Sequence, residues 1–370
     1  TDRSGRFSFF NLPVGEYELR IEYVGVPSKT VSVSVVEGET SELTVTLDED
    51  LDRMLVIGQK AQQSAALSRE RAAVNNINVL SSDAIGQFPD ANVAEALQRV
   101  AGLSLARDQG EGRFAIIRGA NANFNTTTVN GLRVPGPEDD SRAVNLDVVS
   151  ADLVDSVEIS KSITPDQDAD AVGGNIEITT LSAFELGNSL TVSAEGSYNE
   201  KLEKTSPRAS LTGTRLFSVG GGVDNVAVSG SINYFDRKFA VDNVEAGDYP
   251  EFELAGGGFT RIPESAEQRD YELSRKRVGG VFNIEMRPDD RSQYYIRTLY
   301  SDFADNEIEL EHEYIFDEGS PIEVTPNGAL FSDAEVERRG KETTATREIF
   351  TLSIGGENEF DRWSVDYQAG

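Results

Sequence analysis

The sequence predicts a mixed fold: a partial β-sandwich, then an α/β domain, then the first strands of a large antiparallel transmembrane β-barrel. Three patterns along the 370 residues predict it. Short alternating strands with Gly and Pro turns fill residues 1–48, and helix and strand patterns mix in residues 73–180, after a linker at 49–72. Residues 181–370 hold long segments that alternate apolar with small polar residues, which is typical of barrel strands.

Composition excludes several classes of function. The chain has no cysteine and one histidine, His312, so a disulfide scaffold, a thiolate zinc site and a histidine-based triad or metal site are not expected. A net charge of −30 disfavours nucleic-acid binding, which needs a basic surface. No run of about 18 apolar residues is present, so barrel strands are the expected route into a bilayer. We also expect a fragment cut at both ends, because the chain opens inside a hairpin and stops within an alternating segment.

The first domain and the linker carry two different strand patterns. Alternating segments at 17–23, 30–35 and 43–47 predict strands of a small β-sandwich. The linker holds one apolar run among polar neighbours that cannot bury it. Such a run is either the last strand of the sandwich or a strand that adds to the sheet edge of another protein. The run is Met54, Leu55, Val56, Ile57 and Gly58.

The α/β domain combines short strands with one clear helix. Asp90 is the expected N-cap of a helix over 92–100, where apolar side chains share one face, and Gly102 ends it. Connections at 119–126 and 133–142 are rich in Asn, Gly and Pro. The expected strands are 77–80, 114–118, 127–129, 157–159 and 176–179.

The barrel segment is expected to hold about seven strands, with Tyr and Trp near segment ends as interfacial girdles. Long connections at 236–273 and 302–344 alternate with short ones, as outer loops alternate with periplasmic turns. The first long loop, with Tyr249, Phe252 and Phe259, either caps a substrate or is a solvated loop. A barrel that encloses a folded domain has about 22 strands.

Several motifs together resemble a TonB-dependent outer-membrane receptor. The segment 114–119 is similar to the family's IRG strand, and 128–131 takes the place of its usual D-G hairpin, with Asn130 for Asp. Residues 157–159 and 173–179 resemble the ending of the family's plug domain, which makes 73–180 the expected plug. The linker run Met54–Gly58 looks like the TonB box, and residues 1–48 resemble the C-terminal part of a carboxypeptidase-regulatory-like domain.

The resemblance implies location and mechanism. It implies a receptor in the outer membrane of a Gram-negative bacterium, in contact with lipid, with the N-terminal domain and TonB box in the periplasm. The TonB C-terminal domain, energised by ExbB–ExbD and the proton-motive force, would pair with the box and pull on the plug. The segment 161–171 is similar to the KS-x-TPD-x-DADA form of a subfamily typical of Caulobacter- and Xanthomonas-like bacteria, which is associated with carbohydrate uptake. An oligosaccharide is therefore the expected substrate, with a ferric siderophore as the alternative.

Two plug loops are the expected substrate contacts, because amides and carboxylates pair with sugar hydroxyls and an aromatic ring stacks on a sugar face. The alternative is that they are solvated turns. Arg118 and Glu158 are expected to join barrel carboxylates such as Glu195 in a plug–barrel charge network, or to form ordinary surface pairs. The loop candidates are Asn121, Asn123, Phe124 and Asn125 in one loop, and Arg133, Glu138, Asp139 and Arg142 in the other.

No cofactor or catalytic residue is expected. Asp166, Asp168 and Asp170 alternate as calcium ligands do, but without the downstream Glu of an EF-hand loop, so carboxylates that accept backbone N–H groups are favoured over a metal. Gly173-Gly174 lacks the Lys and the helix start of a phosphate loop and is expected to give tight backbone passage. No carboxylate pair, nucleophile elbow or Walker loop marks an enzyme. A glycan-binding outer-membrane protein or adhesin without transport remains the further alternative.

Overall fold

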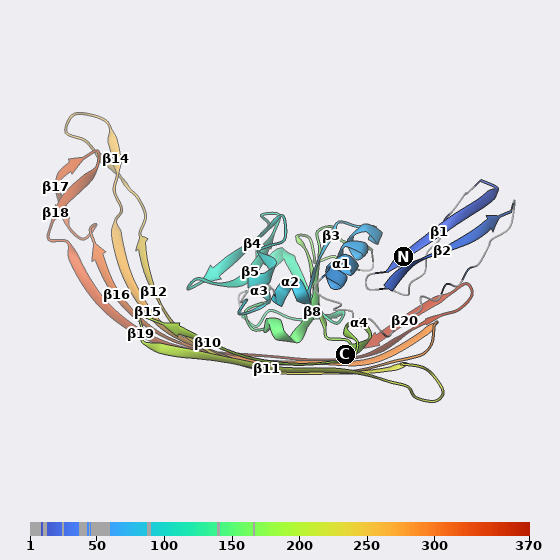
Figure 1. Cartoon of the computed structure of the whole chain (residues 1–370). Helices are drawn as coiled ribbons and strands as arrows, with labels where there is room; N and C mark the ends of the chain where they lie inside the picture. Colours follow the sequence, from blue (N-terminus) through green and yellow to red (C-terminus); the bar gives the residue numbers. More distant parts are fainter. Residues whose placement is uncertain are drawn as a thin grey trace.

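The computed structural model describes residues 9, 13–23, 26–36, 43, 45, 60–86, 90–138, 141–165 and 167–370. Three parts are seen: an N-terminal hairpin, a central unit of helices and short strands, and a large curved sheet that carries the central unit on its concave side (Figure 1). The predicted mixed architecture is confirmed in this described part of the chain.

The N-terminal part is a two-stranded hairpin. Strand β1 (Gly15–Tyr23) pairs antiparallel with β2 (Val26–Val35) in the register Tyr17↔Val33. The predicted strand at 43–47 and the run Met54–Gly58 lie wholly or mostly outside the described residues.

The end of the predicted linker is helical. Helix α1 (Lys60–Ala72) consists mainly of Ala, Gln, Ser, Arg and Glu, and most of these are good helix formers. Its Glu70 carboxylate accepts hydrogen bonds from Asn78 Nδ2 (3.1 Å) and Val79 N (2.8 Å), which ties the helix to the first strand of the central unit. None of the helices in the described ranges is long and apolar enough to span a membrane.

The central unit is built on a five-stranded sheet in the order β3-β8-β9-β6-β7, in which only β6 and β9 are parallel. Beside it lies the hairpin β4 (Leu103–Asp108)–β5 (Glu111–Ile117). All five predicted strands are present, while β4 was not predicted. The sheet strands are β3 (Ile77–Ser81), β6 (Asn125–Val129), β7 (Leu132–Arg133), β8 (Val154–Ser160) and β9 (Gly174–Thr180).

Helices of the central unit are short. They are α2 (Ser82–Gly86), α3 (Val93–Leu97), η1 (Ala122–Phe124), η2 (Ala151–Leu153) and α4 (Ala183–Leu186). The predicted cap of α3 was wrong: Asn92 is the N-cap, and its side chain accepts from Glu95 N at 3.0 Å. Asp90 instead forms an ion pair with Arg99 at 2.6 Å. Two candidate caps lie two residues apart here, and tertiary contacts determine which one is used.

The large sheet has seven antiparallel strands in the order β10-β11-β12-β15-β16-β19-β20, as the sequence predicts. Along the central strands, odd-numbered side chains face the central unit and even-numbered ones face outward. The strands are β10 (Ser189–Asn199), β11 (Lys204–Phe217), β12 (Val226–Ala246), β15 (Ser265–Asp289), β16 (Ser292–Ile315), β19 (Glu335–Glu359) and β20 (Ser364–Ala369).

An exposed apolar belt covers the outward face of the sheet. It runs along β12, β15, β16 and β19 and carries tyrosines at both of its edges, Tyr294 at one and Tyr234 and Tyr300 at the other. Such a belt is what lipid-facing barrel strands require. Its other members include Ile232, Phe282, Ile284, Met286, Ile296, Phe350, Leu352 and Ile354.

The two long connections were predicted as loops, and this was wrong. Strands β12 and β15 stay paired from Asp236↔Lys276 to Ala246↔Ala266, and β16 and β19 are extended in the same way. β12 has 21 residues, about twice the 9–11 that a membrane-crossing strand needs. Each extension ends in a small hairpin: β13 (Glu251–Glu253) with β14 (Phe259–Arg261), and β17 (Ser320–Thr325) with β18 (Gly328–Ser332).

These end hairpins contact each other through aromatic rings. Phe252 of the first lies edge-on to Phe331 of the second at 5.9 Å, and Phe331 stacks on Phe316 at 5.8 Å. Phe252 therefore packs between strands, while Tyr249 and Phe259 stay exposed.

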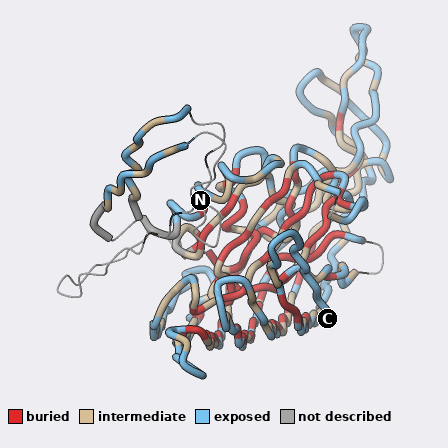
Figure 2. Tube along the Cα trace, turned by 90° about the vertical axis from the view of Figure 1, so that its right-hand side faces the viewer, coloured by how far each residue is buried: buried red, intermediate tan, exposed pale blue. Residues whose placement is uncertain are grey.

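A single apolar core joins the central unit to the sheet. Val281, Leu299, Phe303 and Ile349 of the large sheet belong to the same buried cluster as the strands and helices of the central unit. Buried residues gather in this region, whereas the projecting end of the sheet is largely exposed (Figure 2). The central unit is thus seated on the sheet by apolar packing as well as by the polar contacts described next.

Candidate functional site

Part of the contact between the central unit and the sheet is made by residues 145–153, a segment of turns that ends in η2 and is called the strip from here on. Its carbonyl groups accept hydrogen bonds from sheet side chains: Asp147 O from Arg277 Nε (2.7 Å) and Val148 O from Ser301 Oγ (2.8 Å). On its other side the strip is held by the central unit, since Leu146 N donates to Arg113 O and Val93 N donates to Val149 O. The strip therefore transmits any movement of the central unit to the sheet contact.

Glu111 is the centre of the contact and is almost fully buried. Its two oxygens accept from Arg275 Nη1 (2.9 Å) and Arg277 Nη2 (2.8 Å), and Arg237 lies at 3.5 Å. Asn92, the cap of α3, also donates to it at 3.2 Å. Burial by itself raises the pKa of this carboxyl, but the charges of the three arginines outweigh burial and lower the pKa to about 2. Glu111 is therefore ionised at any physiological pH.

Arg275 completes the group by reaching the β4–β5 turn. It binds Asp305 of the neighbouring sheet strand through Nε (3.1 Å), and Asp108 Oδ2 (3.2 Å) and Gln109 Oε1 (2.7 Å) through Nη2. The turn that presents these groups has positive φ at Gln109 (42°) and Gly110 (82°). A tight turn on the central unit is thereby fixed to the sheet.

Two further ion pairs flank this group. Asp152 binds Arg208 of β11 with both carboxylate oxygens, at 2.8 and 3.2 Å. On the other flank Glu138 accepts from Arg347 of β19 at 3.3 Å and also from Arg113. The pairs place acids on the central unit and arginines on the sheet.

Asp147 is the exception among the buried acids. Its Oδ1 atom has no hydrogen-bond partner, and Nη1 of the adjacent Arg277 has none either. Burial is the main cause that raises the pKa of Asp147, to about 6, although Arg277 and Arg113 act in the opposite direction. Two complementary groups are thus left unpaired at the same contact.

One glycine makes the close apolar contact possible. Gly279 of β15 faces Leu153 of the strip, and a Cβ atom there would lie 2.7 Å from Leu153 Cδ1 and 2.8 Å from Asn233 Oδ1. Any other residue at 279 would push the strip away from the sheet.

The two predicted substrate loops are joined to each other by Asn123. Its Oδ1 accepts from Ser141 Oγ (2.8 Å), Arg142 N (3.0 Å) and Ala143 N (3.1 Å). Asn121 caps η1 within the first loop, and Phe124 is 54% exposed. The loops thus form one surface, with an aromatic ring beside amide groups.

Other predicted loop residues have structural partners. Asn125 is buried and donates to Ala115 O at 2.8 Å, and Glu138 belongs to the sheet contact. Arg133 and Arg142 form ion pairs with Asp170, whose pKa they lower by hydrogen bonding. Asp139 lies outside the described residues.

The aspartate loop is held by arginines. Asp168 and Asp170 pair with Arg133, and the backbone N–H group of Asp170 donates to Asp168 Oδ1 (3.1 Å). The predicted acceptance of a backbone N–H group is thus seen at Asp168, and arginine side chains from another part of the plug add ion pairs to it. Asp166 lies outside the described residues. Gly174 has φ 148° and passes close to Ser160 O, which is the tight passage that was predicted.

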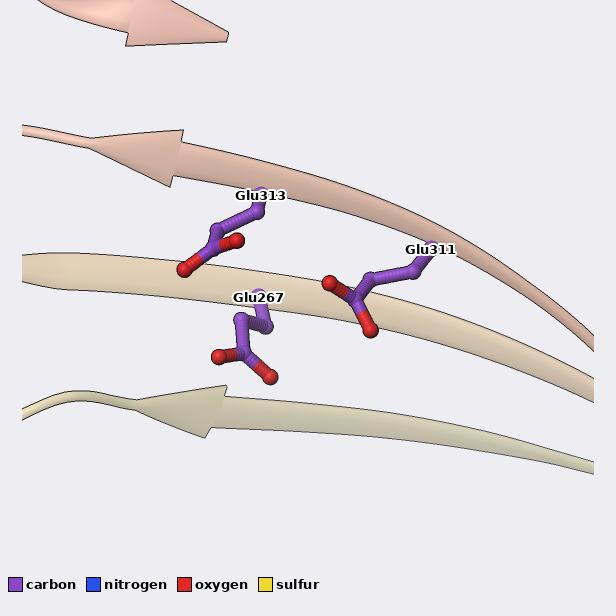
Figure 3. A group of neighbouring side chains, drawn as sticks. All are labelled: Glu267, Glu311 and Glu313. Carbon is purple, nitrogen blue, oxygen red and sulfur yellow. The ribbon is translucent and has the colours of Figure 1, made fainter. Parts of the chain in front are cut away.

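A second acidic group lies on the projecting part of the sheet. The carboxylates of Glu267 (β15), Glu311 and Glu313 (β16) point toward one another, with oxygens within 4.8 Å (Figure 3). Arg269 Nε lies 3.2 Å from Glu311, and Arg339 Nη1 lies 2.8 Å from Glu313. The arginines already supply the positive charge that a cation would bring, so this group is an ion-pair lattice of the wall.

Known families match two parts of the chain. Residues 69–175 match the model of the TonB-dependent receptor plug domain, and residues 1–48 match the carboxypeptidase regulatory-like domain. The first match covers the strands, the strip and the loops that face the large sheet. The chain carries the plug of a TonB-dependent receptor. This family consists of outer-membrane β-barrel receptors and transporters rather than enzymes. From here on the central unit is the plug, and the large sheet is the barrel wall.

Solved structures with a similar arrangement are remote in sequence. The ferric enterobactin receptor of Pseudomonas aeruginosa is 15% identical, with 79% of this chain and 47% of that chain covered and a TM-score of 0.39. The siderophore receptor PirA of Acinetobacter baumannii is 11% identical (80% and 60% covered, TM-score 0.36), and the copper transporter OprC is 13% identical (79% and 45%, 0.36). The chain thus spans about half the length of the first of these proteins. No curated protein sequence matches it.

The ion pairs described above do not include the predicted residues Arg118 and Glu158. Arg118 is exposed at a turn with φ 52° and donates to Gly173 O within the plug at 3.4 Å. Glu158 lies in β8, opposite Glu177 in the plug's own sheet. Glu195 does lie near a wall charge, at 3.7 Å from Arg208.

The residues that do make the contact were missed. They are Glu111, Arg275 and Arg277, which lie in segments whose content of charged residues is typical of a solvent-exposed surface. The alternation along β15 could have identified the two arginines. Arg275 and Arg277 have the same parity as Gly279 and Val281, so they face inward on a strand whose outward face is apolar. A charge that faces the inside of a barrel filled by a plug needs a partner on that plug.

Proposed function

We propose that the whole protein imports a large, scarce solute, most specifically an oligosaccharide, across the outer membrane. TonB would energise the import from the proton-motive force. The observation that carries this proposal is the buried set of ion pairs by which the plug is held against the barrel wall. A lumen filled in this way conducts nothing until the plug moves.

The strength of the contact argues for an external source of work. Removing one partner of a buried ion pair typically costs about 3–5 kcal/mol, and Glu111 alone serves three arginines. Spontaneous release would therefore be rare. TonB, by pulling on the plug of a transporter, would supply this free energy. An adhesin has no need for a plug that can be displaced.

The proposed handle is Met54–Gly58, which would pair as an added strand with the C-terminal domain of TonB. It lies in the proposed linker, 49–72, just before α1. Because Glu70 of α1 binds the first plug strand, tension on the handle would reach the plug sheet directly.

The proposed entry site is the joined loop surface. Asn121, Asn123 and Phe124 offer amides beside an exposed ring, and Arg142 lies beside them as an exposed guanidinium that also pairs with Asp170. Asn125 and Glu138 are left out of this proposal, since their side chains are committed to Ala115 and to the wall.

Val56→Pro tests the proposal, because proline removes a main-chain donor from the added strand. We expect energised uptake to fall to background while binding of solute to whole cells persists. Val56→Leu, which keeps the N–H group, is the matched control and should transport normally. The substrate class is identified by comparing growth on defined glycans with growth under iron limitation.

Two outcomes would contradict the proposal in different ways. If Val56→Pro cells still accumulate solute against a gradient, the handle is misassigned. If the receptor supports growth only under iron limitation, the substrate is a ferric siderophore rather than an oligosaccharide.

A further inference from the structure

One row of inward side chains alternates between arginine and phenylalanine. Direct pairing across five neighbouring strands places these residues at one height on the same face of the wall. The row is Arg208 (β11), Phe235 (β12), Arg277 (β15), Phe303 (β16) and Arg347 (β19).

Each guanidinium in the row stacks on a ring of the row. Arg208 lies 5.7 Å from the centre of Phe235, and Arg277 and Arg347 lie 4.7 and 5.7 Å from the centre of Phe303. Such contacts hold the long side chains in place. The row is therefore an ordered surface of alternating positive charge and flat apolar faces.

In the resting plug, each arginine of the row binds a plug carboxylate. Arg208 binds Asp152 at 2.8 Å, Arg277 binds Glu111 at 2.8 Å and Arg347 binds Glu138 at 3.3 Å. Movement of the plug removes all of these partners together.

Several inward arginines outside the row have acidic partners on the wall itself, whereas Arg237, two positions after Phe235 on β12, pairs with Glu111 of the plug. Arg269 and Arg339 pair with Glu311, and Arg275 pairs with Asp305, so they stay neutralised when the plug leaves. In the described part of the chain, the ion pairs of Arg277 and Arg347 are with plug carboxylates alone. Displacement of the plug would thus concentrate positive charge at this height and at Arg237 just beside it.

We propose that the row is an anion-binding constriction on the solute path, which the plug's carboxylates occupy until it moves. This inference rests on the proposed function, because it requires that the plug be displaced. Guanidinium groups take carboxylate oxygens in paired hydrogen bonds, and rings of arginine select anions in pores. The solute is an anion with flat ring faces, a chemistry that an oligouronide and a ferric catecholate share.

A bilayer measurement tests the row without any need for transport. The full-length receptor is placed in a planar bilayer, and urea unseats the plug while the barrel stays folded. The reversal potential in a KCl gradient gives the ratio of chloride to potassium permeability. Substitution of all three arginines, R208Q/R277Q/R347Q, is expected to lower this ratio about tenfold. The matched control Arg269→Gln, an inward arginine with wall partners, is expected to change it little. Equal ratios in the two variants would overturn the inference.

Uptake by energised cells identifies the source of the anion. The probes are tetragalacturonate, neutral maltotetraose and ferric enterobactin. One of the two anionic probes is expected to enter wild-type cells. Arg347→Gln should lower the uptake of that probe about tenfold, and Arg347→Lys should restore most of this uptake. Ser301→Ala, which weakens the strip contact without removing charge, should affect all probes alike.

Each outcome of the uptake experiment has a separate meaning. Equal loss of neutral and anionic probes in Arg347→Gln means that the arginine only holds the plug, and the inference fails. Wild-type uptake of the neutral tetramer alone also overturns the inference but leaves transport intact. If uptake persists in the Val56→Pro variant, the proposed TonB-driven function is wrong. The bilayer measurement does not depend on that outcome.

Discussion

At the scale of single residues, Glu111 is the side chain on which the plug contact depends most. It is buried, accepts from two arginines and from the cap of α3, and lies near a third arginine. A lowered pKa means that the folded state prefers the ionised form, so the contact adds stability above the unfolded pKa of 4.5. This stability is lost as pH falls from 4.5 towards 2.

We therefore predict that Glu111→Gln weakens plug seating by about 3 kcal/mol at pH 7, since each pKa unit corresponds to about 1.36 kcal/mol. The difference from wild type should shrink towards pH 2.5, where wild-type Glu111 begins to protonate. Urea titrations, with protease cleavage of the released plug, measure the free energy of plug seating at pH 7 and at pH 2.5. Glu195→Gln, at an exposed carboxylate 3.7 Å from Arg208, is the control and should change little. A pH-independent difference would contradict this explanation.

Residue roles were the least predictable part of the sequence. Asn125 and Glu138 stand in loops whose composition suggests ligand contact, yet the partners of Glu138 include Arg347, more than 200 positions away. Local sequence does not reveal such partners, because they depend on how the plug is seated. Phe124 is different, since the aromatic ring was expected on the outward surface of a polar loop and the residue is exposed.

At the scale of elements, strand alternation predicts most of the fold. Parity along Val278–Met286 gives the outward face correctly, because lipid and plug make opposite demands on alternate side chains. The same rule failed for the extensions of β12 and β16, where charged and apolar side chains mix on both faces. There the strands are stabilised by cross-strand ion pairs such as Arg269 with Glu311, and only the register shows them.

The fit between the strip and β15 leads to a prediction about one glycine. We expect Gly279→Ala to destabilise plug seating by about 1–3 kcal/mol, because its methyl group would overlap Leu153 and the side chain of Asn233. Gly230→Ala is the control on the neighbouring strand, where the nearest atom would lie at 3.7 Å. The urea midpoint for plug release measures both variants. Equal midpoints would show that the strip can move away from the wall at no cost.

At the scale of the whole molecule, one sheet serves two environments along its length. Near the short turns its outward face is an apolar belt edged by tyrosines. Beyond Tyr300 this face becomes mixed, with Asp302 and Asn306 in outward positions beside the exposed Ile308 and Leu310. The inward face changes as well, from apolar packing against the plug to ion-pair lattices. The membrane boundary is therefore expected to cross the strands near Tyr234 and Tyr300, with the rest projecting into water.

This boundary can be located with two matched arginine substitutions. Phe282 and Ile308 are both outward and similarly exposed, at 53% and 47%, but only Phe282 lies inside the belt. Arginine on a lipid-facing position near the bilayer midplane costs about 2–4 kcal/mol, falling to about 0–1 kcal/mol near the interface. We expect Phe282→Arg to lower the barrel's unfolding free energy in lipid vesicles by an amount in the first range, and Ile308→Arg to leave it nearly unchanged. Equal losses would place the extension in the bilayer, and the absence of any loss at Phe282 would mean that the belt does not face lipid.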